Sequence, residues 1–425
     1  MQLESYWLAS RGLAPATAPA DLPARASVVV IGGGLTGLSA ARTLAKNGTD
    51  VVVLEADAIG AAASGRNGGQ CNNGIATDLG ALAERLGMDA ACAIYTAFND
   101  AVDRVEAIVT EEAIACDFVR NGKLKLADKP DHARKLIKAV ALLQRTVDPD
   151  ARYLDRAALG HEIGSDAFHG GIVLPLSGSV HVGRLTRGLA DAARRHGAQI
   201  LERTAVTGLT RIDGGKHRIA TRRGTIVADE VLLATGVSGV GPFGWLRRRI
   251  VPVGSFVIAT EPLGEDRIAR LMPGRRNYTT SRHIGNYFRL AADGRLIFGG
   301  RALFAMPTPQ NVDRGGKILR ARLGQIFPDL ADVPIAHVWG GVLDMTADRL
   351  PRAGAHGGVH YAVGLSGHGV QMSVFLGDRM ADVILGNRKD QPFSALPWPA
   401  VPGHFGKPWF LPAVGAYYRY LDWRY

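Results

Sequence analysis

Residues 27–37 read Ser27-Val28-Val29-Val30-Ile31-Gly32-Gly33-Gly34-Leu35-Thr36-Gly37, and they indicate the fold class more directly than any other part of the chain. The apolar, β-branched residues before the glycines predict a buried strand. After the glycines, apolar residues recur at helical spacing until Asn47-Gly48, where the sequence predicts a helix stop. Residues 50–55 predict a second buried strand, so this part of the chain forms a βαβ unit.

The glycines between the strand and the helix fit the pattern G-x-G-x-x-G, which binds dinucleotides. Glycine lets the backbone approach a pyrophosphate, and the helix N-terminus attracts its negative charge. Glu55 ends the second strand, where a carboxylate binds ribose hydroxyls. Chance turns also produce the glycine pattern, but without this strand, helix and carboxylate around it. The predicted contacts are Gly32, Gly34, Leu35, Thr36, Gly37, Glu55 and Ala56.

Small residues predominate at positions 59–70, and this run favours FAD over NAD as the dinucleotide. An extended cofactor can lie against such backbone, and Arg66 and Asn67 can reach phosphate or flavin atoms. A flexible glycine and alanine linker is the alternative. The sequence has neither a second dinucleotide pattern nor a Cys-x-x-Cys pair, which argues against NAD(P)H-linked disulfide reductases. The predicted FAD contacts in this run are Ala63, Ser64, Gly65, Arg66, Asn67, Gly68, Gly69 and Gln70.

Two later turns are also predicted to contact FAD. An ordinary strand and turn explains residues 231–236 equally well, but the strand ends in the small residues Ala234, Thr235 and Gly236. The second turn opens a helix whose positive dipole end suits the negative charge that builds on the flavin upon reduction. It contributes Gly364, Gly367, His368, Gly369 and Val370, and His368 could add a proton or a positive charge. His356 and His360 make no metal-ligand set with His368, so no metal is expected.

The remaining pattern predicts two interleaved architectures in an α/β protein. Residues 182–193 have helical periodicity, and extended segments follow at 199–201, 206–212, 217–221, 225–227 and 230–234. Residues 252–301 are predicted to be almost wholly strands. The aromatic tail from Trp398 onward is predicted to pack back on the body.

Composition limits the class of protein. With 425 residues, 47% of them apolar, the chain is long enough for two domains. The formal charge is +11, but the basic residues cluster poorly, so no nucleic-acid partner is predicted and an anionic cofactor accounts for part of the surplus. No membrane partner is predicted, because no apolar run approaches the roughly 20 residues of a membrane helix. A cytoplasmic location is expected, since three scattered cysteines fit a reducing compartment and no secretion signal precedes residue 27.

Together these blocks resemble the D-amino-acid-oxidase-type family of FAD-dependent amine oxidoreductases, and within it most of all the gamma-glutamylputrescine oxidase group. The resemblance runs nearly end to end. It rests on Ser5-Tyr6-Trp7, Gly65-Arg66-Asn67-Gly68-Gly69-Gln70, Thr260-Glu261-Pro262-Leu263, Tyr287-Phe288-Arg289-Leu290, Trp339-Gly340, Ser366-Gly367-His368-Gly369-Val370 and Gly415-Ala416-Tyr417-Tyr418.

The resemblance implies a Rossmann-like FAD-binding domain of the glutathione-reductase type, interleaved with an antiparallel-sheet substrate domain. The FAD-binding domain is expected at 26–85, 155–240 and 340–390, the substrate domain at 86–154 and 241–339, and a C-terminal tail at 391–425. Val206 is expected to contact the adenine through its backbone. The implied reaction is hydride transfer from the carbon beside an amine nitrogen to flavin N5. The resulting imine hydrolyses to an aldehyde or oxoacid, and oxygen takes the electrons to give hydrogen peroxide.

Four catalytic candidates follow, although each is also explained as a packing or surface residue. Arg66 and His368 are expected to stabilise reduced flavin, while Tyr287 and Arg289 are expected to face the substrate from the strand-rich lid. Two alternatives to an oxygen-using amine oxidase stay open. One is a dehydrogenase that passes electrons to a quinone or partner protein, and the other is a non-catalytic FAD-binding subunit of a complex. A homo-oligomer is compatible with the sequence.

One departure from the family pattern bears on the substrate. Glycine and D-amino-acid oxidases carry an Arg-Pro pair just ahead of Thr-x-Asp-x-x-Pro, where the arginine grips the substrate carboxylate. Here that motif spans residues 346–351 and is preceded by Leu343-Asp344, so the bidentate clamp is missing. The sequence therefore predicts that a plain α-amino acid is not the best substrate. An amine with its carboxylate farther from the reacting nitrogen fits better.

Overall fold

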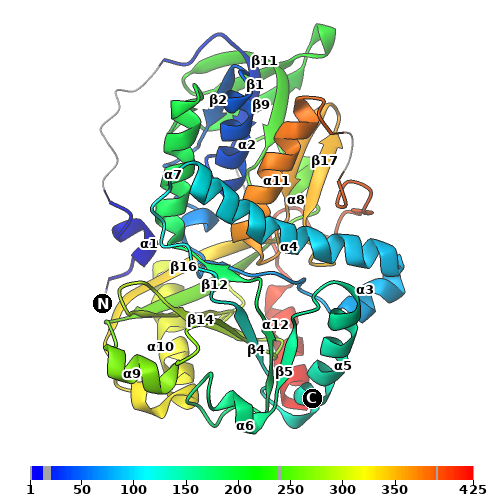
Figure 1. Ribbon diagram of the computed structural model, residues 1–425. Coiled ribbons are helices and arrows are strands. Elements are labelled where there is room, and N and C mark those ends of the chain that lie inside the picture. Colours follow the sequence, from blue (N-terminus) through cyan, green and yellow to red (C-terminus); the bar gives the residue numbers. More distant parts are fainter. Residues whose placement is uncertain (1, 13–20, 238–240, 389–390, 425) are drawn as a thin grey trace.

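The structure is a computed structural model that describes residues 2–12, 21–237, 241–388 and 391–424. Two large sheets form the body, one in the upper and one in the lower half of Figure 1. The first sheet has the strand order β17-β18-β11-β1-β2-β8, and the second has the order β16-β12-β15-β14-β13-β4-β6-β5. Long-range pairing thus brings distant parts of the chain into each sheet.

The first sheet contains the predicted βαβ unit. Its strands β1, β2, β8, β11 and β18 are parallel. Val28 and Val30 pack into one core while Val29 and Ile31 pack into another, so both faces of β1 are covered. The strands are β1 (Arg25–Ile31), β2 (Val51–Leu54), β8 (Gln199–Leu201), β9 (Val206–Arg211), β10 (His217–Thr221), β11 (Gly224–Leu233), β17 (Arg352–His356) and β18 (Val359–Val363).

Helices cover one face of this sheet (Figure 1). The helix α2 ends at Lys46 with Asn47 as its C-cap, and Gly48 follows with a φ of 78°, a left-handed conformation that suits glycine and confirms the predicted stop. Its companions contribute apolar faces to the same core. The helices of this layer are α2 (Leu35–Lys46), α3 (Leu79–Leu86), α4 (Met88–Glu111), α7 (Val182–Arg195) and α11 (Gly369–Ile384).

The second sheet was expected to be antiparallel, and it is mixed, because β13 and β4 pair in parallel. Helices α9 and α10 pack on its outer face through a separate core. The strands are β4 (Lys123–Leu126), β5 (Arg152–Leu154), β6 (Gly171–Leu174), β12 (Val251–Thr260), β13 (Asn277–Thr280), β14 (Asn286–Leu290), β15 (Leu296–Gly300) and β16 (Ile335–Met345). The helices beside it are α5 (Pro130–Thr146), α6 (Arg156–Leu159), α9 (Glu265–Leu271) and α10 (Pro309–Ile326).

Two local predictions were wrong. The stretch 252–301 is not almost wholly extended, because α9 forms between Gly264 and Met272 and buries Ile268 and Leu271. Residues 225–227 and 230–234 do not form two strands. They belong to one strand, β11, whose first half pairs with β10 and whose second half pairs with β1.

The expected domain boundaries also differ from the sheets in three places. The strand β6 falls in the expected segment 155–240 but pairs with β4 and β5 in the second sheet. The helix α4 falls in the expected segment 86–154 but packs in the core of the first sheet. The strand β16 begins before the boundary at 340 and crosses it. Positions 240, 390 and 425, where three expected segments end, lie outside the described residues.

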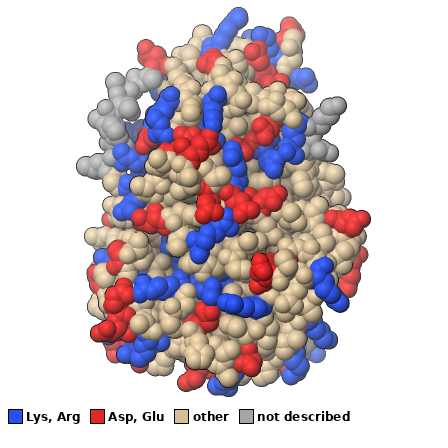
Figure 2. All heavy atoms as spheres, viewed as in Figure 1, with Lys and Arg blue, Asp and Glu red and all other residues tan. Residues whose placement is uncertain are grey.

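Several short elements complete the chain. Close to the C-terminus, Asp422 accepts hydrogen bonds from the backbone N–H groups of His283 (2.8 Å) and Ile284 (2.9 Å), so the last helix packs on the second sheet. No helix among the described residues is long and apolar enough to cross a membrane. Figure 2 shows basic and acidic side chains interspersed over the face in view. The short elements are α1 (Tyr6–Ala9), β3 (Gln70–Cys71), β7 (Gly178–Ser179) and α8 (Gly244–Arg247), and the last helix is α12 (Leu411–Arg424).

Candidate active site

The predicted cofactor contacts meet at one edge of the first sheet. The strands β1, β2, β11 and β18 are parallel, so their carboxyl ends lie together. These ends carry Gly32, Glu55, Ala234 and Gly364, which are far apart in the sequence. Ligands of open parallel sheets bind outside this edge. The structure therefore brings four separate predicted segments to one binding edge.

Close packing at this edge explains the glycines. A methyl group on Gly32 would lie 2.5 Å from the carbonyl oxygen of Ala234, and one on Gly37 would lie 2.0 Å from the carbonyl oxygen of Gly32. Glu55 accepts a hydrogen bond from the N–H of Gly33 (2.6 Å), so its carboxylate stands beside the turn. The geometry fits a dinucleotide, with the glycines at its pyrophosphate and the carboxylate at its ribose.

Segment 63–65 reaches the same turn. Ser64 Oγ accepts a 3.0 Å hydrogen bond from the N–H of Leu35 at the start of α2. Val206, the first residue of β9, lies nearby, because the preceding segment pairs with the end of β2 through Thr204 N–H and the carbonyl of Glu55 (2.7 Å). The residues expected at the adenine and at the pyrophosphate are thus neighbours in the fold.

Residues 65–69 form a loop whose five consecutive carbonyls are all held by other parts of the protein. Side chains donate to four of them, and the backbone N–H of Val180 donates to the carbonyl of Gly69 (2.9 Å). The other four contacts are Ser5 Oγ to Gly65 (2.5 Å), Trp339 Nε1 to Arg66 (2.9 Å), Trp7 Nε1 to Asn67 (2.6 Å) and Arg289 Nε to Gly68 (3.1 Å).

This anchoring fits the loop to a cofactor. Asn67 Oδ1 accepts from the N–H of Gly69 (2.8 Å), which tightens the loop. The N–H groups of Asn67 and Gly68 make no hydrogen bond to any described residue. Donors held on a rigid loop are suited to the acceptor oxygens and nitrogens of a flavin. The guanidinium of Arg66 instead donates hydrogen bonds to the carbonyls of Ala61 (2.8 Å) and Gly340 (3.3 Å).

The glycine-rich turn before α11 is held by Asp344. Its buried carboxylate accepts from the N–H of Gly364 (2.7 Å), and its backbone carbonyl accepts from the N–H of Ser366 (3.1 Å). Burial raises the pKa of Asp344 to about 6, although the backbone N–H groups around it act in the opposite direction. The Asp344 carboxylate therefore fixes this turn. The sequence pattern identified the turn but did not indicate that Asp344 holds it.

His368 stands at the N-cap of α11, with its ring edge-on to Phe98 at 5.3 Å between centroids. Burial, together with the charges of Lys123 and Lys125, lowers the pKa of His368 to about 4. The imidazole is therefore neutral near pH 7, and the prediction that it adds a positive charge is not supported. Nδ1 is buried without a hydrogen-bond partner among the described residues, so it is available to a ligand.

Tyr287 and Arg289 point to the same face of β14 but have different surroundings. A methyl group added at Gly68 would lie 2.6 Å from the Tyr287 ring, and one added at Gly299 would lie 2.4 Å from it. The ring therefore packs directly against the anchored loop. Arg289 is 4% exposed and donates to the carbonyls of Gly68, Val180 and Leu290. The guanidinium of Arg289 therefore supports the loop, and a direct contact of Arg289 with the substrate stays a prediction.

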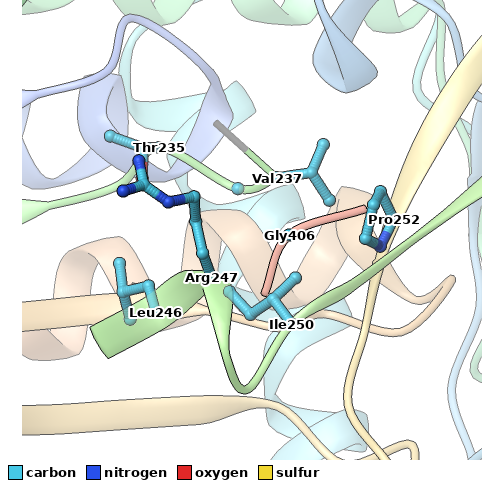
Figure 3. A pocket seen from close by; sticks show the side chains of 8 residues that line it. Thr235, Val237, Leu246, Arg247, Ile250, Pro252 and Gly406 are labelled. Carbon is cyan, nitrogen blue, oxygen red and sulfur yellow. The ribbon is translucent and has the colours of Figure 1, made fainter. Parts of the chain in front are cut away.

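Thr235 and Gly236 lie at a small pocket on the carboxyl edge (Figure 3). Arg247 from α8 brings a guanidinium to this pocket and donates to the carbonyl of Gly241 (2.7 Å). The sequence did not single out Arg247 for a role at this edge. The pocket is lined by Thr235, Gly236, Val237, Leu246, Arg247, Ile250, Pro252 and Gly406.

Other supporting residues were also missed as site residues. The sequence identified Trp7 and Trp339 only through the family resemblance. Each indole N–H donates to a loop carbonyl that is far away in the sequence, so no local pattern indicates the contact. Gln371 is buried on α11 and donates to the carbonyl of Asn72 (2.5 Å), while its Oε1 has no partner among the described residues. The described residues contain no group of side chains that could hold a metal ion.

The fold and this edge define a flavoprotein oxidoreductase. The chain matches the family model described as DAO, FAD dependent oxidoreductase, over residues 27–383, and it belongs to this family. FAD is its cofactor, and the residues above fit it.

Relatives match over nearly the whole chain. Gamma-glutamylputrescine oxidoreductase of Escherichia coli (strain K12) is 33% identical over 93% of this chain and 92% of its own length. A probable oxidoreductase, OrdL, of Rhizobium meliloti (strain 1021) is 34% identical over 89% of this chain and 88% of its own. The solved glycine oxidase from Geobacillus kaustophilus has a TM-score of 0.74 at 21% identity, covering 89% of this chain and 100% of that chain. At that identity the structural match shows the shared fold.

Proposed function

We propose that this enzyme oxidises a primary or secondary amine whose carboxylate lies away from the reacting nitrogen, with gamma-glutamylputrescine as the leading candidate. The observation that carries the proposal is the segment before Thr346. Leu343 stands where glycine and D-amino-acid oxidases have a carboxylate-binding arginine, and Asp344 beside it is turned to the N–H of Gly364. A carboxylate adjacent to the reacting carbon would meet no cation there. The relative of that name supports the same substrate class.

FAD, when bound, accepts the hydride from the carbon beside the amine nitrogen, and oxygen is the proposed final acceptor. The chain itself positions the reactants. In this proposal the anchored loop 65–69, with the ring of Tyr287 packed against it, would form one wall of the reaction site, and the first turn of α11 would form another. The positive end of the α11 dipole favours the negative charge that develops upon reduction. His368, neutral at pH 7, donates or accepts a hydrogen bond there and does not supply a charge.

The proposal includes the division of labour between the two sheets. The first sheet and its helices would hold FAD, and the second sheet would cover its reacting face and choose the amine. We also propose a cytoplasmic location, because Cys71, Cys92 and Cys116 are all free thiols.

Anaerobic reduction of the holoenzyme by a panel of amines tests the function. We expect gamma-glutamylputrescine to bleach the flavin rapidly, and glycine and D-alanine to act at least about 100-fold more slowly, as expected for a lost charged contact. Equal rates for the three compounds would contradict the proposed substrate class. Under air, one hydrogen peroxide for each amine oxidised supports the oxidase. Bleaching without peroxide would indicate a dehydrogenase, and no bleaching by any amine would indicate a non-catalytic subunit.

A further inference from the structure

Lys125 lies on the face of the second sheet that looks toward the first sheet. Its neighbours on β4, Leu124 and Leu126, are fully buried in the outer core, so Lys125 points to the opposite face. Register places Lys125 beside Thr279, and Thr279 beside Tyr287. Paired residues of neighbouring strands share a face. Lys125 and Tyr287 therefore belong to one row across the sheet.

The side chain of Lys125 is exposed on this inner face of the second sheet. Desolvation by the surrounding protein lowers the pKa of Lys125, and Asp78 opposes the shift. The charge of Lys125 also lowers the pKa of His368, so the two groups are close enough to interact. Lys125 is thus open to solvent and lies near His368 at the start of α11.

The backbone of Lys125 pairs within the sheet, but its side-chain ammonium makes no hydrogen bond or ion pair with any described residue. Asp78 is the carboxylate that favours its charged form, but Asp78 Oδ1 is already engaged by the N–H groups of Gly80 (2.9 Å) and Ala81 (3.2 Å). A partly desolvated cation without a side-chain partner gains from an incoming anion, because the anion replaces the lost hydration and favours the charged form. The position of Lys125 is therefore chemically suited to an anionic group.

We propose that Lys125 is a specificity-determining residue that binds the remote carboxylate of the amine substrate. This inference rests on the proposed function and deepens it. Two strand spacings separate the backbones of Lys125 and Tyr287, about 10 Å. An amine whose carboxylate is several bonds from the reacting carbon can extend from the Tyr287 side of the site to Lys125. An α-amino acid is too short to place its reacting carbon beside Tyr287 and its carboxylate on Lys125. In this proposal Lys125, in the middle of the second sheet, binds the carboxylate in place of the arginine that glycine and D-amino-acid oxidases carry in the segment before Thr346.

The test compares two amines with the same reacting end. Gamma-glutamylputrescine carries the carboxylate, while N-acetylputrescine has the amide without it. In the holoenzyme, Lys125→Met is expected to raise KM for gamma-glutamylputrescine by about 10- to 100-fold, as expected for a charged hydrogen bond. The kcat for that substrate and both constants for N-acetylputrescine are expected to stay within about 3-fold. Lys125→Arg keeps the charge and should restore most of the affinity. Lys138→Met, on the exposed face of α5, is the matched control.

A second measurement separates this inference from the proposed function. Glutarate, a dicarboxylate that cannot be oxidised at an amine, is titrated while the flavin absorbance spectrum is recorded. We expect saturable binding to the wild type that Lys125→Met weakens at least about 10-fold. If no amine is oxidised but this difference holds, the anion site stands and the proposed function fails. Equal losses with both amines would identify a catalytic base or a folding role, and unchanged KM and glutarate binding would remove Lys125 from specificity; either result overturns the inference.

Discussion

Arg289 Nε donates a 3.1 Å hydrogen bond to the carbonyl of Gly68, and so ties the second sheet to the cofactor loop. The same guanidinium donates to Val180 O at 2.5 Å and lies 5.0 Å from the ring centroid of Trp7. Burial lowers the pKa of Arg289 to about 10, which still leaves it charged at neutral pH. One buried cation therefore holds three segments against each other.

Arg289→Met should weaken both folding and cofactor retention. The variant leaves the carbonyls of Gly68 and Val180 without their donors in the interior, at a cost of about 2–4 kcal/mol in the free energy of unfolding. The purified protein should also contain less FAD. Urea unfolding and the ratio of flavin to protein absorbance measure the two effects. The control is Arg270→Met, which removes an exposed ion pair with Asp329 and should cost at most about 1 kcal/mol. Unchanged FAD content in Arg289→Met would contradict the loop-support role.

Gly37→Ala should abolish FAD binding. The added methyl group would lie 2.0 Å from the carbonyl oxygen of Gly32, so α2 and the turn must separate. Gly160→Ala is the matched control, because Gly160 has helical φ and ψ and its nearest new contact is an ordinary 3.5 Å. Equilibrium dialysis of FAD against both refolded variants makes the comparison. FAD affinity within about 10-fold of the wild type in Gly37→Ala would show that the turn has room to relax.

Asp344→Asn should change how stability depends on pH. The pKa of Asp344 rises from 3.8 to about 6 in the folded protein, so between these values the folded state keeps a proton that the unfolded chain has lost. Wild-type stability therefore falls as pH rises from about 4 to 6, by at most about 1.4 kcal/mol per pH unit from this group. The asparagine lacks that titration, so the difference in unfolding free energy between variant and wild type should move in favour of the variant over this range. A difference that stays constant from pH 4 to 7 would argue against the raised pKa.

Lys123→Met should show the opposite window. Burial and, to a smaller extent, the charge of Lys125 lower the pKa of Lys123 from 10.5 to about 7, while Asp148 opposes the shift. Between these pKa values the unfolded chain binds more protons than the folded protein. The buried lysine therefore lowers the free energy of unfolding most below pH 7, and wild-type stability rises toward pH 10. The methionine variant should gain most, relative to wild type, at pH 6 and least at pH 9. Lys138→Met should show no such trend. If Lys123→Met loses stability equally at pH 6 and pH 9, the 2.5 Å hydrogen bond from Lys123 to the carbonyl of Asn73 outweighs the cost of burying the charge.

The cofactor edge could be predicted because its signals are local. A strand, a glycine turn and a helix are adjacent at 27–46, and the carboxylate of Glu55 follows within the same unit. The helix α9 was missed because it has seven residues between extended segments, too short for a clear period. The parallel pairing of β13 with β4 was missed because those strands are more than 140 residues apart, and register is set by tertiary packing.

By itself, the sequence determined that a βαβ unit binds a dinucleotide, because backbone conformation and helix dipoles act over a few adjacent residues. It also indicated, through Leu343-Asp344, that an arginine clamp is absent. Only the tertiary structure shows that Arg289 supports the loop, that His368 is neutral and that Lys125 and Tyr287 lie in one row with a single strand between them. Those properties depend on burial and on contacts between residues far apart in the chain, which no local pattern encodes.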